Sequence, residues 1–322
     1  MGSNIRWGLI GCGDIARKRV APALRDSDAS ELYSVARARP ELAADFAAEF
    51  GARKHHADWR DLLADPEIDA VYVATPVDLH AEQTIAAAAA GKHVLCEKPI
   101  AIRAADGEAM SRACESAGVK FGIAYYRRFY PAVRRIKELL TDGTIGEPVL
   151  VRIDAFEQFN PPPGGDRSWL IDPARSGGGP MMDFGSHRIE LLLDWFGDPV
   201  DVTSYSDSVL LQRDAEDASS VQMRFASGVR GAVTVSHAVF GFRDSLEVFG
   251  SRGSLQVPSL NGGDITIRTA EGERTEVLPP HANFHQPLVD DFVAAIRDDR
   301  SPTVGANCAV AVQRVLDKIY GR

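Results

Sequence analysis

The sequence predicts an α/β protein with two domains: an N-terminal doubly wound parallel sheet, and a C-terminal α/β domain with an open, mainly antiparallel sheet. Three observations lead to this prediction. Short apolar strands and helical segments alternate up to residue 125, whereas longer runs with alternating polarity follow. The chain has 322 residues, more than one ordinary core requires. We therefore expect one domain over residues 1–125 and another over residues 126–322.

The first domain is expected to alternate strands with helices. Strands are predicted at residues 5–11, 31–37, 69–76, 93–99 and 119–125, and helices at 13–26, 40–51, 59–65, 79–92 and 103–118. Pro40 suits the first turn of a helix, and Gly91 suits the residue after a helix C-terminus. This alternation predicts parallel pairing, with helices on both faces of the sheet.

The first strand is followed by the motif GCGDIA, in which Gly11, Gly13 and Ala16 fit G-x-G-x-x-G/A. The first glycine allows a tight turn, the second lets the backbone approach a pyrophosphate, and the small third residue lets the helix pack closely. Asp14 and Ile15 open the helix, whose N-terminal N–H groups suit phosphate. The motif stands between a strand and a helix, as a dinucleotide-binding Rossmann fold requires. The alternative is a structural glycine turn.

The second strand ends in Arg37, with Arg39 two residues later. An acidic residue there would bind the 2′-hydroxyl of NAD, whereas an arginine accommodates the 2′-phosphate of NADP. We therefore expect NADP, with NAD as the other possibility. The alternative is that both arginines are solvated at the surface.

The second domain is expected to begin with a helix and to continue as strands. Strand-like runs cover 149–159, 199–211, 219–240, 244–258 and 263–279, and their alternation predicts an antiparallel sheet. A helical insert at 177–197 interrupts them, and helices at 285–299 and 306–321 close the chain.

Glu97 and Lys98 follow a predicted strand in the motif CEKP. Ligands of open α/β sheets bind at the carboxyl ends of such strands. Pro99 biases Lys98 away from helical geometry and makes a cis bond possible. A partly desolvated lysine at this place could serve in proton transfer. The alternative is a solvated Glu–Lys pair.

Asp183 and His187 lie four residues apart in GGGPMMDFGSHRIELL, and therefore on one face of a helix. The preceding glycines, residues 177–179, permit close approach of backbone or ligand. Histidine beside a carboxylate suits general-base work on a hydroxyl group. A structural Asp–His pair is the alternative.

Charge and composition narrow the class of protein. The net charge of -9 argues against a general nucleic-acid binder or a basic membrane-surface protein, and no apolar run is long enough to span a membrane. The four cysteines are scattered without a CxxC motif, so we expect reduced thiols, a cytoplasmic protein and no metal site built from them.

Several motifs occur together in one order: GxGxxA, Ala74-Thr75-Pro76 with His80, EKP, YRRF, and GGG followed by Asp and His. In this combination the chain resembles the glucose–fructose oxidoreductase / inositol dehydrogenase / MocA (Gfo/Idh/MocA) family over essentially its whole length. The EKP and GGGxxxDxxxH blocks carry most of the specificity.

The resemblance implies hydride transfer between NAD(P) and a hydroxyl or keto group of a sugar or cyclitol-like substrate. It also implies a sheet that mediates homodimers or homotetramers. Lys98 matches the family lysine beside nicotinamide and substrate, and Asp183 and His187 match the pair that holds and deprotonates the hydroxyl. Four further residues match positions that line the cofactor: Thr75, Pro76, His80 and Glu97.

The chain departs from the family pattern at Val77 and Arg188, where asparagine and an acidic residue are frequent. Arg188 could contact an anionic substrate, or pair with Glu190 or Asp194. The sugar, the direction of reaction and the oligomer number stay open. A non-catalytic nucleotide-binding regulator on this fold, or an NAD-recycling lyase or hydrolase, remains an alternative.

Overall fold

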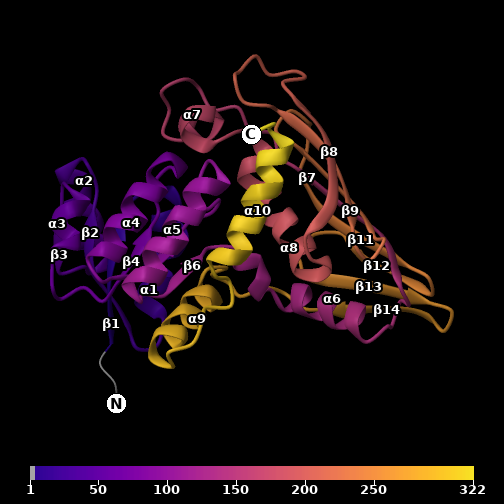
Figure 1. The fold of residues 1–322 in the computed structure, drawn as a ribbon, viewed down its shortest axis with the longest axis horizontal. Helices are drawn as coiled ribbons and strands as arrows, with labels where there is room; N and C mark the ends of the chain where they lie inside the picture. Colours follow the sequence, from indigo (N-terminus) through magenta and orange to yellow (C-terminus); the bar gives the residue numbers. More distant parts are fainter. Residues whose placement is uncertain (1–3) are drawn as a thin grey trace. The chain divides into compact units, whose positions relative to one another are not determined.

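The computed structural model describes residues 4–322 (Figure 1). The chain forms two compact units. The first unit comprises residues up to Tyr126 together with His281–Val310, and the second comprises Arg127–Pro280 and Ala311–Arg322. The break near residue 126 lies next to the expected boundary. The return of residues 281–310 to the first unit differs from the expectation that residues 126–322 form one domain.

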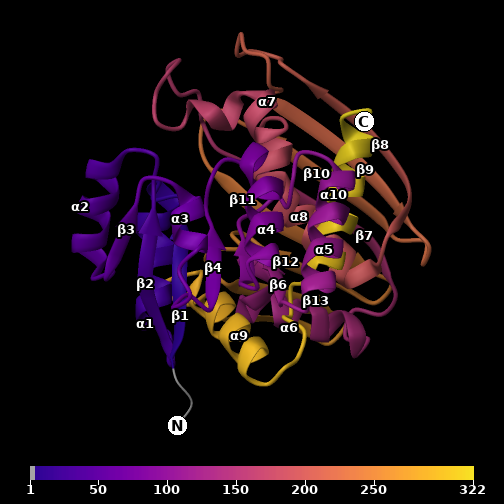
Figure 2. The same ribbon diagram turned by 60° about the vertical axis from the view of Figure 1, so that its left-hand side comes forward.

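The first unit is built on a six-stranded sheet in the order β3-β2-β1-β4-β5-β6, and all its neighbours pair in parallel (Figure 2). This order is that of a doubly wound dinucleotide-binding fold. The strands are β1 (Ile5–Ile10), β2 (Ser30–Ala36), β3 (Lys54–His56), β4 (Ala70–Val73), β5 (His93–Cys96) and β6 (Phe121–Ile123). The sequence did not predict β3, because its three residues, Lys-His-His, lack an apolar pattern.

Helices connect these strands. They are η1 (Ala16–Val20), α1 (Ala21–Asp26), α2 (Pro40–Phe50), α3 (Trp59–Leu63), η2 (Val77–Leu79), α4 (His80–Ala89) and α5 (Ala104–Ala117). The short helix η3 (Tyr126–Phe129) follows β6 and spans the division between the two units. The central strands carry apolar side chains on both faces, as parallel strands between two helical layers require. Leu9, Val71 and Leu95, on β1, β4 and β5, are fully buried.

The segment that returns to the first unit carries α9 (Gln286–Arg297) and the beginning of α10 (Ala306–Ile319). Phe292 of α9 packs on Trp7 of β1, with ring centroids 5.7 Å apart. The Ile123 N–H of β6 donates to the carbonyl of Val304 at 3.0 Å. Burial of the apolar face of α9 therefore explains why this segment belongs with the first sheet.

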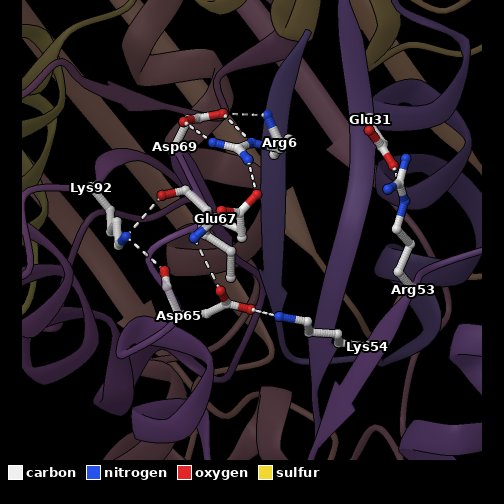
Figure 3. Close-up of polar contacts among 9 residues, drawn as sticks. Arg6, Glu31, Arg53, Lys54, Asp65, Glu67, Asp69 and Lys92 are labelled. Carbon is white, nitrogen blue, oxygen red and sulfur yellow. Dashed lines mark hydrogen bonds and ion pairs between the residues drawn. The ribbon is translucent and has the colours of Figure 1, made fainter.

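The amino-terminal ends of the first unit's strands carry a charged network (Figure 3). Arg6 binds Asp69 through its backbone N–H at 2.9 Å and through its Nε at 3.1 Å. Lys54 pairs with Asp65 at 2.7 Å. Lys92 donates to the carbonyls of Asp65 and Ile68, at 2.9 and 2.8 Å. These contacts satisfy polar groups at the edge opposite to the ligand-binding edge of such sheets.

The second unit contains an eight-stranded sheet in the order β14-β13-β12-β11-β7-β10-β9-β8. Its strands are β7 (Pro148–Phe156), β8 (Pro199–Asp207), β9 (Ala218–Phe225), β10 (Arg230–Ser236), β11 (Arg243–Gly250), β12 (Gly253–Val257), β13 (Asp264–Thr269) and β14 (Gly272–Val277). Pairing is antiparallel except between β7 and β10, which confirms the expected mainly antiparallel sheet.

One face of this sheet is covered by helices. Val151 of β7 and Val248 of β11 are register partners on that face, and Val233 of β10 pairs with Ile153 of β7. All four are buried, and α8 and α6 pack against the sheet (Figure 1). The unit's helices are α6 (Pro131–Thr141), η4 (Ser168–Ile171), α7 (Pro173–Ser176), η5 (Met181–Gly185), α8 (Ser186–Phe196) and the end of α10. Among residues 4–322, no helix is both long and apolar enough to cross a lipid bilayer.

Candidate active site

The glycine turn lies between β1 and the first helix, as predicted. Gly11 has φ +96°, and a Cβ there would lie 2.6 Å from the carbonyl oxygen of Ala74, so only glycine fits this turn. At Gly13, by contrast, a Cβ would meet no heavy atom of the described chain within 4 Å. Ala16, the first residue of η1, is fully buried. The turn therefore combines a tight bend with open space beside the backbone, which fits a pyrophosphate group.

The residues that open the helix are exposed. Asp14 pairs with Lys18 at 2.9 Å, one turn later, and Ile15 keeps 38% of its surface accessible. The Arg17 N–H donates to the carbonyl of Gly13 at 3.0 Å and so begins the helical hydrogen bonding. The N–H groups of the residues before Arg17 have no partner within the helix, and such groups suit an anion.

Arg37 folds back over the same turn. Its Nη1 donates to the carbonyl of Cys12 at 2.9 Å, and its backbone N–H donates to the carbonyl of His56 at 3.1 Å. Burial raises the pKa of the Cys12 thiol to about 12, even though the charge of Arg37 opposes this shift. Arg39 is exposed and precedes α2. The structure therefore places Arg37, but not Arg39, against the glycine turn.

Thr75 and Pro76 lie in the turn after β4, and His80 begins α4. His80 is fully buried, and its two ring nitrogens lie 3.0 Å from the carbonyl oxygens of Thr75 and Pro99. Burial lowers the pKa of His80, and these carbonyls offset only part of the shift. His80 therefore ties the turn after β4 to the turn after β5, and Thr75 donates to Gln83 at 2.7 Å.

Glu97 follows β5 and is buried in a polar network. It accepts hydrogen bonds from the Tyr72 hydroxyl at 2.8 Å and from His285 Nε2 at 3.2 Å. Burial raises the pKa of Glu97, but the hydrogen bond and charge of His285, the charge of Lys98 and the Tyr72 hydroxyl outweigh it, so the pKa lies below its usual value. The ring of Tyr126 packs on His285 with centroids 4.7 Å apart. An ionised Glu97 thus stands directly before Lys98, and the Lys98–Pro99 peptide bond is cis.

The second unit holds Asp183 and His187 on one continuous helical segment. Asp183 lies in the π-helical turn η5 and His187 lies in the first turn of α8, where it is 2% exposed. The predicted helix is therefore interrupted by a π-turn at the candidate site, a feature that frequently marks functional positions. The Ser186 hydroxyl donates to the carbonyl of Asp183 at 2.8 Å and fixes the backbone between the two residues.

The glycine run before this helix serves packing within the protein. A Cβ at Gly178 would lie 2.3 Å from the Tyr320 hydroxyl, and one at Gly179 would lie 2.1 Å from the carbonyl oxygen of Glu216. The Glu216 carboxylate accepts from the N–H groups of Gly179 at 2.7 Å and Met181 at 3.1 Å, and from Tyr320 at 2.7 Å. Burial raises the pKa of Glu216, although these donors oppose the shift. The sequence left open whether backbone or ligand approaches these glycines. At Gly178 and Gly179 the approaching groups belong to the protein, namely Tyr320 and Glu216.

Arg188 is bound inside the second unit. Its guanidinium pairs with buried Asp244, and its Nη1 donates to the carbonyl of Phe184 at 2.8 Å. Glu190 pairs with Arg128. The Arg188 partner Asp244 lies on β11, and no sequence-local pattern indicated it.

Five residues around these positions escaped sequence analysis: Tyr72, Glu216, Asp244, His285 and Tyr320. Their hydrogen bonds reach the predicted residues, or in the case of Tyr320 the neighbouring Met182, across 25 to 188 positions of sequence, and none stands in a motif of its own. Within residues 4–322, no group of three His, Cys, Asp or Glu side chains is arranged to hold a metal ion.

Comparison with known proteins extends these findings to both domains. Residues 5–125 match the family model described as "Oxidoreductase family, NAD-binding Rossmann fold", and residues 133–256 match the GFO/IDH/MocA C-terminal domain. The chain is 36% identical over 308 residues to 1,5-anhydro-D-fructose reductase of Ensifer adhaerens, covering 92% of this chain and 90% of that protein. It is 30% identical over 276 residues to myo-inositol 2-dehydrogenase of Thermotoga maritima, covering 84% and 80%.

A similar solved structure is levoglucosan dehydrogenase in complex with NADH and levoglucosan. It superposes with a TM-score of 0.89 at 26% identity, covering 99% of this chain and 97% of that one. The glycine turn, the strand order and the two matching domain models agree with this likeness. The chain therefore belongs to the Gfo/Idh/MocA family of oxidoreductases with an NAD-binding Rossmann fold.

Proposed function

We propose that the protein transfers a hydride between NAD(P) and a hydroxyl or keto group of a sugar or cyclitol-like substrate. The observation that carries this proposal is the placing of Lys98 along the first sheet. The glycine turn follows β1 and Lys98 follows β5, with only β4 between these strands. Two strand spacings amount to about 10 Å. This separation suits a dinucleotide whose phosphates lie at the turn and whose nicotinamide lies farther along the same edge.

The cofactor, when bound, supplies the hydride acceptor or donor. The residues that would hold it are Gly11, Gly13, Asp14, Ile15 and Ala16 at the phosphates, Arg37 and Arg39 at the adenosine, and Thr75, Pro76, His80 and Glu97 along the carboxyl edge. The open space beside Gly13 and the tight turn at Gly11 support this assignment. Buried His80 and Glu97 act through the backbone and through Lys98, because their polar atoms already bind protein groups.

Three residues carry the proposed chemistry. In oxidation, His187 takes the proton of the substrate hydroxyl, and Asp183 orients that hydroxyl. Lys98 stabilises the developing oxyanion electrostatically. In reduction, the same groups supply the proton. The depressed pKa of Glu97 keeps a negative charge beside Lys98.

We further propose that NADP is preferred over NAD. Arg37 directly follows β2, where an acidic residue would bind the ribose of NAD, and its guanidinium already binds the glycine turn. Arg39, which is exposed, would contribute less because of solvent screening.

The direct test measures absorbance of NADH and NADPH with purified protein and a panel of levoglucosan, myo-inositol, 1,5-anhydro-D-fructose and related ketosugars. Net change in nucleotide absorbance with one of these compounds is the expected result. Product formation without net change would favour the NAD-recycling lyase or hydrolase. Nucleotide binding without turnover of any compound would favour a regulatory protein.

The uncovered face of the second sheet suits self-association. Leu150 and Phe249 are register partners on β7 and β11, with 48% and 38% of their surfaces exposed, and Tyr205 on β8 is 78% exposed. We expect a homodimer or homotetramer through this face. Light scattering coupled to size exclusion should show a smaller mass for Leu150→Asp than for the unaltered protein.

A cytoplasmic location is proposed from the four free cysteines.

A further inference from the structure

His237 lies directly after β10 and is fully buried in the second unit. Its backbone N–H donates to the carbonyl of Asp217 at 2.8 Å, and its carbonyl accepts from the N–H of Phe159 at 3.0 Å. Its ring packs against Phe159, with centroids 5.0 Å apart, and against Phe184 at 5.2 Å. Phe184 directly follows Asp183. The ring is thus held from several sides, next to a residue of the candidate site.

Arg213 fixes which nitrogen of His237 carries the proton. The Arg213 Nη2 lies 2.9 Å from Nδ1 of His237. A guanidinium only donates hydrogen bonds, so Nδ1 must present its lone pair and the neutral ring must carry its proton on Nε2. Arg213 is itself held by the carbonyls of Phe159 at 3.1 Å and Glu216 at 2.8 Å.

The ring is neutral over the physiological range. Burial lowers the pKa of His237 to about 4, although the negative charge of Asp183 opposes the shift. The charges of Arg213 and Arg167 lower it further, and that of Asp217 raises it. A neutral ring with a fixed tautomer is a directed hydrogen-bond donor rather than a proton carrier.

The Nε2–H of His237 is a buried donor for which residues 4–322 provide no hydrogen-bond acceptor. Such a group destabilises a protein unless another state satisfies it. Of the two carboxylates that act on the ring, Asp217 already accepts the backbone N–H groups of Val209 at 2.9 Å and Leu210 at 2.8 Å. The charge of Asp183 raises the pKa of His237 more than the charge of Asp217 does.

We propose that His237 is a positioning residue whose Nε2–H donates a hydrogen bond to the Asp183 carboxylate in the working enzyme. This contact orients the carboxylate toward the substrate hydroxyl, and Arg213 secures the tautomer that makes it. The inference rests on the proposed function for the role of Asp183. It adds two residues to the site: His237, directly after β10, and Arg213, in the loop between β8 and β9.

Two matched variants separate the hydrogen bond from packing. His237→Asn retains an acceptor near the Nδ1 position for Arg213 but removes the donor at Nε2. His237→Gln can place an amide N–H near the Nε2 position. We expect kcat to fall about ten- to a hundredfold in His237→Asn, as for loss of one hydrogen bond to a charged group, with KM for NADPH unchanged. In His237→Gln we expect kcat to recover in large part. Unchanged kcat in His237→Asn, or equal losses in both variants, would overturn the proposal.

A second measurement does not depend on turnover. Long-range ¹H–¹⁵N correlation spectra of histidine-labelled protein report the tautomer and the Nε2–H resonance of His237. We expect the Nε2–H tautomer, and an upfield shift of this proton in Asp183→Asn. The Nδ1–H tautomer, or an identical resonance in both proteins, would contradict the inference. If no sugar is turned over, the proposed function fails while these spectra still decide the His237–Asp183 contact.

Discussion

Replacing Glu216 with glutamine tests how the helix of Asp183 and His187 is held. The Glu216 carboxylate accepts three hydrogen bonds, from the N–H groups of Gly179 and Met181 and from the Tyr320 hydroxyl. In its best orientation, a glutamine amide retains the oxygen that serves Met181 and Tyr320. It then turns its NH₂ group toward the N–H of Gly179.

The expected cost follows from this geometry. Loss of one charge-assisted hydrogen bond amounts to about 1.5–3 kcal/mol. Burial opposes ionisation of Glu216 and raises its pKa, so relief of the buried charge keeps the net loss toward the lower end. For a domain of this size, each kcal/mol corresponds to a fall in Tm of roughly 2–4 °C. We therefore expect the second unit of Glu216→Gln to melt about 3–8 °C lower.

Calorimetry of the unaltered protein, Glu216→Gln and Glu271→Gln provides the assay. Glu271 is exposed in the turn between β13 and β14, so its variant controls for loss of a carboxylate. We also expect kcat to fall about tenfold in Glu216→Gln, because the backbone that carries Asp183 loosens and small misplacements reduce rates strongly. If Glu216→Gln melts and turns over like Glu271→Gln, the carboxylate does not secure this helix and the reasoning is refuted.

Four further predictions follow from the other residues. Lys98→Met should lower single-turnover rates about 10²–10³-fold, as for a lost oxyanion donor, while nucleotide binding followed by fluorescence stays intact; a rate within about tenfold of the unaltered protein would remove Lys98 from the chemistry. His187→Asn should lower kcat about 10²–10⁴-fold in steady-state assays, and a smaller loss would assign the proton transfer to another group. Arg37→Asp should weaken NADP binding about ten- to a hundredfold and improve NAD binding; tighter binding of NAD than NADP by the unaltered protein would exclude a phosphate clamp. Burial raises the pKa of Asp65, but the hydrogen bond from Lys54 outweighs it, so the pKa is lowered in the folded protein. The ionised Asp65 therefore stabilises the fold above about pH 4, and this stabilisation is lost at lower pH. The urea midpoints measured at pH 7 and pH 3 should differ less in Asp65→Asn than in the unaltered protein, and an equal difference would contradict this prediction.

Local patterns in the sequence were sufficient for most of the fold. Alternating strands and helices predicted the parallel sheet, and GCGDIA placed the tight turn at Gly11 because a positive φ with no room for a Cβ admits only glycine. Alternation with period two predicted the second sheet, since one face is buried and the other is open. The sequence did not reveal β3, whose three residues, Lys54–His56, pair with β2 through their backbone and have no apolar side chain.

The sequence by itself determined the residue types of the site and their place at strand and helix ends. Only the tertiary structure decided their partners. It joined the glycine run to Tyr320 and Glu216, Arg188 to Asp244, and α9 with the beginning of α10 to the first unit. The physical reason is that a buried charge or polar group must find a partner in space, and many sequence positions offer the same charge. Which of them becomes the partner depends on how distant strands and helices pack, and no local pattern records that choice.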